Sequence, residues 1–121
     1  MNTVQNANCI FEGIDKEMPL ELSSEEVGSF AIVNEGSKLA IAIDCDIDTE
    51  GDLTLDIYKG LTYDANSMQK DNQTESNTTI NLVDGNNIIE FDCYFPAVRL
   101  DIAAAYEKIG RVRSVRYISK D

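Results

Sequence analysis

The feature that most constrains this chain is the alternation of large aliphatic residues with small or polar ones between Lys38 and Tyr58. Successive side chains of a β-strand point to opposite faces, so an alternation of period two places its apolar residues on one buried face. Those residues are Leu39, Ile41, Ile43, Cys45 and Ile47 and, after a turn at Glu50-Gly51-Asp52, Leu53, Leu55 and Ile57. The pattern predicts a β-hairpin in an antiparallel sheet whose other face is acidic and solvated.

The same alternation returns in the second half of the chain, in segments separated by turn signals such as Asp84-Gly85-Asn86. The further predicted strands are 29–33, 78–83, 87–95, 98–102 and 111–119. In the last of them the apolar residues do not share one parity, which predicts either a β-bulge or burial on both faces. Seven to nine short strands without a convincing helix predict an all-β fold, an antiparallel jelly-roll-like β-sandwich.

The 121 residues are enough for one domain. We assign the β-sandwich to residues 29–121 and an N-terminal arm or irregular segment to residues 1–28. Residues 59–77 are mostly polar and predict a long exposed loop. The predicted core residues are Ile41, Ile43, Leu55, Ile57, Ile89 and Phe91. The sequence shows neither an apolar run long enough to span a membrane nor a secretory signal.

The net charge of −12 is distributed unevenly along the chain. Residues 1–98 hold 4 Lys or Arg against 19 Asp or Glu, whereas residues 99–121 hold 6 against 3. Because an acidic body repels nucleic acid and anionic membranes, we expect neither as a partner. The basic residues near the end are Arg99, Lys108, Arg111, Arg113, Arg116 and Lys120. They either meet an acidic partner surface or, as the favoured interpretation, neutralise carboxylates on neighbouring strands.

The residue types of most enzyme active sites are missing from this chain. It has no histidine, which removes the commonest general base, the Ser/His and Cys/His nucleophiles and most zinc sites. Neither a Walker motif nor a GxGxxG motif is present. We therefore expect no enzymatic activity and no cofactor. We expect Cys9, Cys45 and Cys93 to be reduced, with disulfide pairing as the alternative, and the last two to be small buried hydrophobes.

The acidic run that begins at Asp44 is the one motif that resembles a metal site. Asp44, Asp46 and Asp48 would share one face of a strand, and Asp56 would lie across the predicted hairpin. An EF-hand is excluded, because Thr49 replaces the glycine of the sharp turn and the final bidentate glutamate is missing. Calcium binding by the three aspartates is therefore the lesser alternative. The favoured interpretation is an acidic face that is either solvated or paired with the arginines of the basic end.

The C-terminal third of the chain reads IIEFDCYFPAVRLDIAAAYEKIGRVRSVRYISKD. It resembles the ending of small jelly-roll capsid decoration or auxiliary head proteins of tailed bacteriophages. In this resemblance Ala97 to Ile102 is the "vRl" strand, Gly110 lies in the next loop, and 111–119 completes a closing hairpin. The segment 51–58 resembles the middle hairpin of these proteins. The resemblance implies a non-enzymatic structural protein of the virion, made in the host cytoplasm, whose partner is the major capsid protein or another virion protein.

Docking on such a particle is expected to use the apolar part of the arm and the arginines of the basic end. The residues are Cys9, Ile10, Phe11, Ile14, Arg111, Arg113 and Arg116. The alternative function is a carbohydrate-binding or adhesin-like β-sandwich module, with Tyr58, Tyr63 and Tyr94 as sugar contacts. Association into a homo-oligomer is a further open alternative.

Overall fold

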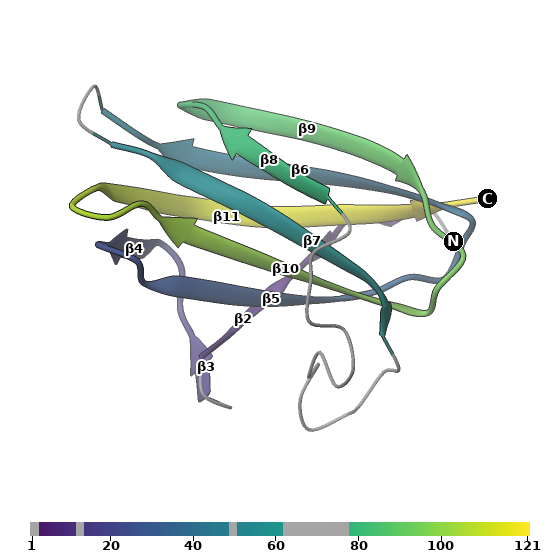
Figure 1. Cartoon of the computed structure of the whole chain (residues 1–121). Coiled ribbons are helices and arrows are strands. Elements are labelled where there is room, and N and C mark those ends of the chain that lie inside the picture. Colours follow the sequence, from purple (N-terminus) through teal and green to yellow (C-terminus); the bar gives the residue numbers. More distant parts are fainter. Residues whose placement is uncertain (1–2, 12–13, 49–50, 62–77) are drawn as a thin grey trace.

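The computed structural model of this chain describes residues 3–11, 14–48, 51–61 and 78–121. They form two antiparallel β-sheets packed face to face, which confirms the predicted all-β sandwich (Figure 1). The strands are β1 (Gln5–Asn6), β2 (Asn8–Phe11), β3 (Ile14–Lys16), β4 (Leu20–Ser23), β5 (Val27–Val33), β6 (Lys38–Asp46), β7 (Leu53–Leu61), β8 (Thr78–Leu82), β9 (Gly85–Asp92), β10 (Ala97–Ala104) and β11 (Ile109–Lys120). None of the described residues belongs to a helix long and apolar enough to cross a membrane.

The two layers are named sheet I and sheet II. Sheet I has the order β1–β11–β6–β9, with β4 also paired to β11. Sheet II has the order β3–β2–β5–β10–β7–β8. Of the strands in the described residues, the seven from β5 to β11 are five residues or longer, in agreement with the predicted seven to nine. The four from β1 to β4 are two to four residues long.

The predicted hairpin between residues 38 and 58 is wrong, although both of its strands exist. β6 lies in sheet I between β9 and β11, whereas β7 lies in sheet II between β8 and β10. The chain thus crosses between the sheets after β6, and it crosses again after β8, after β9 and after β10. The last crossing replaces the closing hairpin that was expected between β10 and β11. Both sheets turn the apolar faces of their strands toward the same core. Two consecutive strands therefore show the same alternation whether they pair in one sheet or lie in different sheets.

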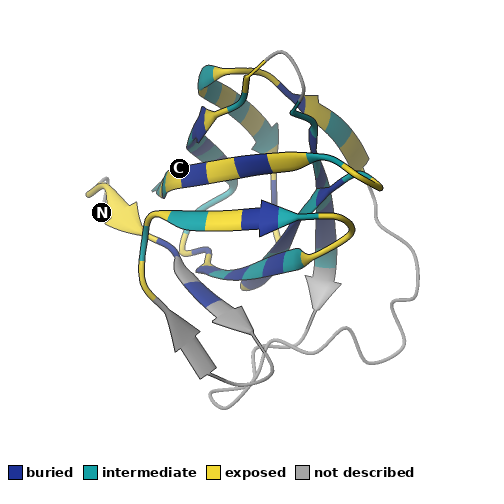
Figure 2. Ribbon diagram, turned by 90° about the vertical axis from the view of Figure 1, so that its left-hand side faces the viewer, coloured by how far each residue is buried: buried dark blue, intermediate teal, exposed yellow. Residues whose placement is uncertain are grey.

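The core lies between the sheets and consists of the residues that the alternation places on the inner faces (Figure 2). Four of the six predicted core residues are at most 2% exposed: Ile41, Ile43, Leu55 and Ile57. Ile89 and Phe91 also pack against the core but stay partly exposed. They lie on β9, which is the edge strand of sheet I and is therefore covered from fewer sides.

Most of the first 28 residues belong to the sandwich, which corrects the prediction of a separate arm. β2 pairs with β5 in sheet II, where Cys9 lies opposite Phe30 and is 2% exposed. β1 and β4 both pair with β11 in sheet I. The predicted boundary at residue 28 falls inside β5. Strands of two to four residues are too short to display an alternation, so the sequence pattern did not reveal them.

The predicted irregularity of the last strand is a β-bulge. The register of β11 against β6 shifts between Val112 and Ser114, with Arg113 as the extra residue. Val112 and Val115 are therefore both buried although they are three positions apart. The bulge also leaves Arg113 exposed on the outer surface of sheet I.

Candidate functional site

The outward face of sheet I is built from β11, β6 and β9, which lie side by side. Four rows of outward residues cross these strands in that order: Lys120–Lys38–Asp92, Ile118–Ala40–Glu90, Arg116–Ala42–Ile88 and Ser114–Asp44–Asn86. In the two middle rows the central strand carries alanine, while both neighbouring strands carry longer side chains. This difference in length leaves a depression along β6.

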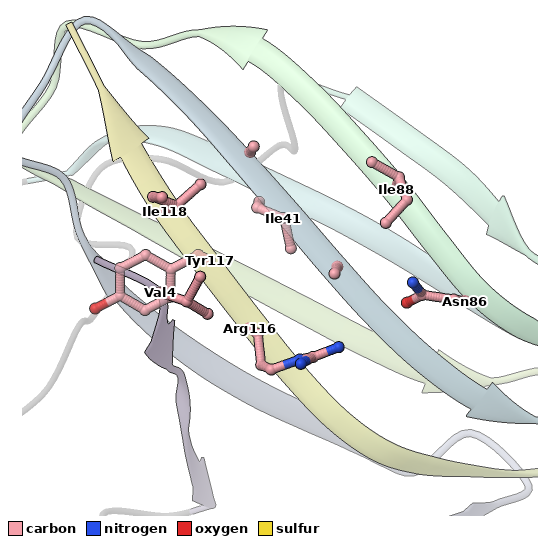
Figure 3. A pocket seen from close by; sticks show the side chains of 9 residues that line it. Val4, Ile41, Asn86, Ile88, Arg116, Tyr117 and Ile118 are labelled. Carbon is pink, nitrogen blue, oxygen red and sulfur yellow. The ribbon is translucent and has the colours of Figure 1, made fainter. Parts of the chain in front are cut away.

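The depression is an open groove of about 270 Å³ (Figure 3). Ala40 and Ala42 form its floor, because an alanine side chain ends at Cβ. The walls include Asn86 and Ile88 from β9 and Arg116 and Ile118 from β11. The groove therefore combines an apolar surface with one amide and one guanidinium.

The apolar residues around the groove are unusually exposed. Ile88 is 67% exposed and Val4, which lines the groove beside β11, is 57% exposed. Single exposed aliphatic residues are common on proteins, whereas contiguous ones mark binding surfaces. Of the residues that line this groove, only Arg116 was predicted from the sequence as a binding residue. The available signals were the outward alanines of β6 and the pair Ile88-Ile89, which gives β9 isoleucine on both faces.

Ion pairs lie at both ends of the groove. At one end Glu90 lies 3.4 Å from Lys120 and 3.7 Å from Lys38, which also lies 3.9 Å from Asp92. At the other end the guanidinium of Arg113 lies 3.3 Å from Asp44 and 3.6 Å from Asp46. These are solvent-exposed pairs that contribute little to stability, so their main effect here is to neutralise carboxylates along this face.

Two of the three candidate calcium ligands, Asp44 and Asp46, take part in these contacts. The hydrogen bond from Arg113 to Asp44 raises the pKa of that guanidinium. Asp56 lies in sheet II and accepts a hydrogen bond from Thr79, so it does not join the aspartates of β6. In the described part of the chain, no group of three or more His, Cys, Asp or Glu side chains could hold a metal ion. The interpretation that arginines of the basic end pair with this acidic face is confirmed for Arg113.

The residues expected to dock on a capsid are not brought together on one surface. Cys9 is in the core, while Ile10, Phe11 and Ile14 belong to β2 and β3 of sheet II. The three arginines lie on β11 in sheet I, where Arg111 pairs with Glu21 at 3.6 Å, Arg113 pairs with the aspartates of β6, and Arg116 lines the groove.

The tyrosines proposed as sugar contacts have different environments. Tyr58 is only 6% exposed, so its ring is not available to stack on a sugar. Tyr63 lies outside the described residues. Tyr94 is 77% exposed in the loop that follows β9. Tyr94 lies two residues after Asp92, which is the last outward residue of β9.

A buried amide holds the loop that carries Tyr94. The Nδ2 atom of Asn34 lies 2.9 Å from the carbonyl oxygen of Cys93 and 3.1 Å from those of Gly36 and Phe95. Asn34 itself is 7% exposed. Buried polar groups bonded in this way fix the local backbone, so the loop presents Tyr94 in a defined position.

All three cysteines are free and buried, as expected for Cys45 and Cys93. Burial, with a smaller contribution from the Asp44 carboxylate, raises the pKa of the Cys45 thiol to about 11. Since the thiolate is the nucleophile, we expect Cys45 to resist iodoacetamide at mildly alkaline pH in the folded protein and to react after unfolding in urea. Peptide mass spectrometry measures the labelling. Fast labelling of the folded protein would contradict the tight packing of β6.

No protein-family model and no curated protein matches this sequence. Among solved structures, the CBM36-1 domain of a multidomain xylanase from the hindgut metagenome of Trinervitermes trinervoides is 7% identical with a TM-score of 0.52, and the match covers 100% of this chain and 98% of that one. The xylan-binding module CBM15 is 14% identical with a TM-score of 0.53, covering 100% and 99%. The Glycosylation Associate Protein (Gap123) complex from Streptococcus agalactiae is 16% identical with a TM-score of 0.55, covering 96% of this chain and 24% of that one.

At these low identities the likeness concerns the fold alone. The chain has the β-sandwich architecture of carbohydrate-binding modules over nearly the full length of two of them. None of the three structures named here is a capsid protein, and the expected role in a virion stays an untested prediction.

Proposed function

We propose that this chain is a non-catalytic carbohydrate-binding module that holds a segment of a glycan in the groove along β6. The observation that carries the proposal is the groove itself, an open trough with an apolar floor and polar groups on its walls. The fold shared with the two carbohydrate-binding modules described above supports it, because the likeness extends over almost their whole length.

The chemistry of the groove fits a sugar. Sugar rings present C–H groups on their faces and hydroxyl groups at their edges. The C–H faces would pack on Ala40, Ala42 and Ile88, which removes apolar surface from water. The hydroxyls would exchange hydrogen bonds with the amide of Asn86, which donates and accepts, and with Arg116, which donates. Ligand sites commonly combine apolar walls with a few polar groups that fix orientation.

The groove is also ordered before any ligand binds. β6 is hydrogen-bonded to a strand on each side along most of its length, so its two alanines are fixed by the sheet. A preformed site loses less conformational entropy on binding than a mobile one. Tyr94, held by Asn34 beyond the end of β9, would offer an aromatic ring to a chain that extends past the groove.

Filling the groove is expected to weaken glycan binding without unfolding the protein. We expect Ala42→Phe to weaken binding by about tenfold or more, a loss of at least about 1.4 kcal/mol, because the ring occupies the floor of the trough. Affinity gel electrophoresis against a panel of soluble plant and bacterial polysaccharides, followed by calorimetry on those that bind, measures the change. The matched control is Asn81→Phe, which adds the same ring at an exposed position of β8 in sheet II.

Three results would contradict this proposal. The first is a wild-type protein that binds no polysaccharide of the panel. The second is an Ala42→Phe variant that binds as well as the Asn81→Phe control. The third is binding that Tyr94→Ala abolishes and Ala42→Phe leaves intact, since the site would then be the loop after β9.

A further inference from the structure

Arg116 differs from the other arginines of the chain. It lies in the middle of the groove wall, opposite Ala42 of β6 on one side and Asn6 of β1 on the other. Its side chain extends from β11 beside the alanine floor (Figure 3). In contrast, Arg99 contacts Asp101 at 2.7 Å, Arg111 contacts Glu21, and Arg113 contacts two aspartates. Within the described residues, no carboxylate lies within 4.0 Å of Arg116.

The acidic residues of the rows around the groove have basic partners other than Arg116. Glu90 and Asp92 are paired with lysines at one end of the groove. Asp44 and Asp46 are paired with Arg113 at the other end. The chain as a whole has 22 acidic and 10 basic residues, so an arginine without a carboxylate partner is unexpected on charge balance alone. The groove therefore contains an arginine that none of the acidic residues of the rows around it contacts within 4.0 Å.

We propose that the glycan bound in this groove carries carboxylate groups, as in a polymer of uronic acids, and that Arg116 binds them. This inference rests on the proposed function of the groove. The planar guanidinium matches a carboxylate with two parallel N–H···O hydrogen bonds, and such charge-assisted bonds are stronger than neutral ones. The apolar residues beside Arg116 exclude water from part of the contact, which strengthens the attraction.

The rest of the site is compatible with an acidic sugar. The net charge of −12 repels a polyanion at long range. Salt screens this repulsion beyond about 8–10 Å, whereas it weakens the direct contact of a carboxylate with Arg116 much less. At one end of the groove the lysines Lys38 and Lys120 balance the carboxylates of Glu90 and Asp92, so that end adds no net negative charge. Ala42 and Ile88 lie in the same row as Arg116, so one ring could pack on them while its carboxylate meets the guanidinium.

The test compares polymers that differ only in the carboxylate. Calorimetry with sodium polygalacturonate and with its fully methyl-esterified form separates the charge from the sugar backbone, and sodium alginate supplies a second uronic acid polymer. We expect the wild-type protein to bind an acidic polymer about tenfold or more tightly than a neutral one. Arg116→Gln should remove this preference, so that the affinity for the acidic polymer falls to that for the neutral form. The matched control, Arg111→Gln, changes an exposed arginine of the same strand outside the groove and should keep the preference.

The remaining outcomes separate this inference from the proposed function. Equal affinity for the acidic and esterified polymers would overturn the inference and leave carbohydrate binding intact. A preference that survives in Arg116→Gln would overturn the role of Arg116. Absence of binding to these polymers and to the neutral panel would overturn both proposals. Thermal unfolding of each variant verifies that the sandwich is folded in every comparison.

Discussion

Deletion of residues 1–14 is expected to unfold the sandwich. The deleted segment contains β1, β2 and the first residue of β3, and it contributes Ala7 and Cys9 to the core. Its loss removes the pairing of β2 with β5 and of β1 with β11, including the hydrogen bond of 2.9 Å from the Ala7 amide to the Val115 carbonyl. Domains are stable by only about 5–15 kcal/mol, so the loss of two strand pairings and part of the core exceeds what this fold tolerates.

Far-UV circular dichroism and thermal unfolding measure this loss. The control is deletion of residues 1–3, which lie before β1 and the groove residue Val4, and it should leave the cooperative transition nearly unchanged. A truncated protein that keeps a cooperative transition near the wild-type temperature would restore the view of these residues as a separable arm. It would also reopen the predicted docking of that arm on a virion partner.

Phe30→Ala is expected to lower the free energy of unfolding by about 3–5 kcal/mol. Phe30 lies on β5 inside sheet II, between Cys9 of β2 and Leu100 of β10, and only 1% of its surface is exposed. Truncation removes buried surface and leaves a cavity that neighbours on two strands cannot fill. Urea unfolding monitored by circular dichroism gives the difference.

The matched control for this prediction is Phe95→Ala. Phe95 is 47% exposed in the loop after β9, so the same truncation should cost less than about 1 kcal/mol. Equal losses at the two positions would mean that the inner face of β5 is not the centre of the core.

The sequence alone predicted the candidate site only in part. It indicated that basic residues near the end of the chain neutralise acidic strands, and the pairs of Arg111 and Arg113 agree with that. It gave no means of telling which arginine would be left without a carboxylate. The answer depends on the bulge at Arg113, because the bulge sets the register of β11 against β6. That register determines which residues of β11 lie opposite Asp44 and Asp46 and which residue lies opposite Ala42.

The alternation by itself determined the longer strands, from β5 to β11, and the phase of those from β5 to β10. Residues such as Ile41 and Leu55 had to be buried, because in either sheet the inner face of a strand is its apolar face. The tertiary structure alone decided which strands pair, because both sheets share one core and local periodicity carries no information about partners. It also decided the groove, which needs β6, β9 and β11 from separate parts of the chain to lie side by side. A pattern that repeats every two residues specifies which face of a strand is buried. A binding site also requires particular strands to lie side by side, and the pattern does not specify that.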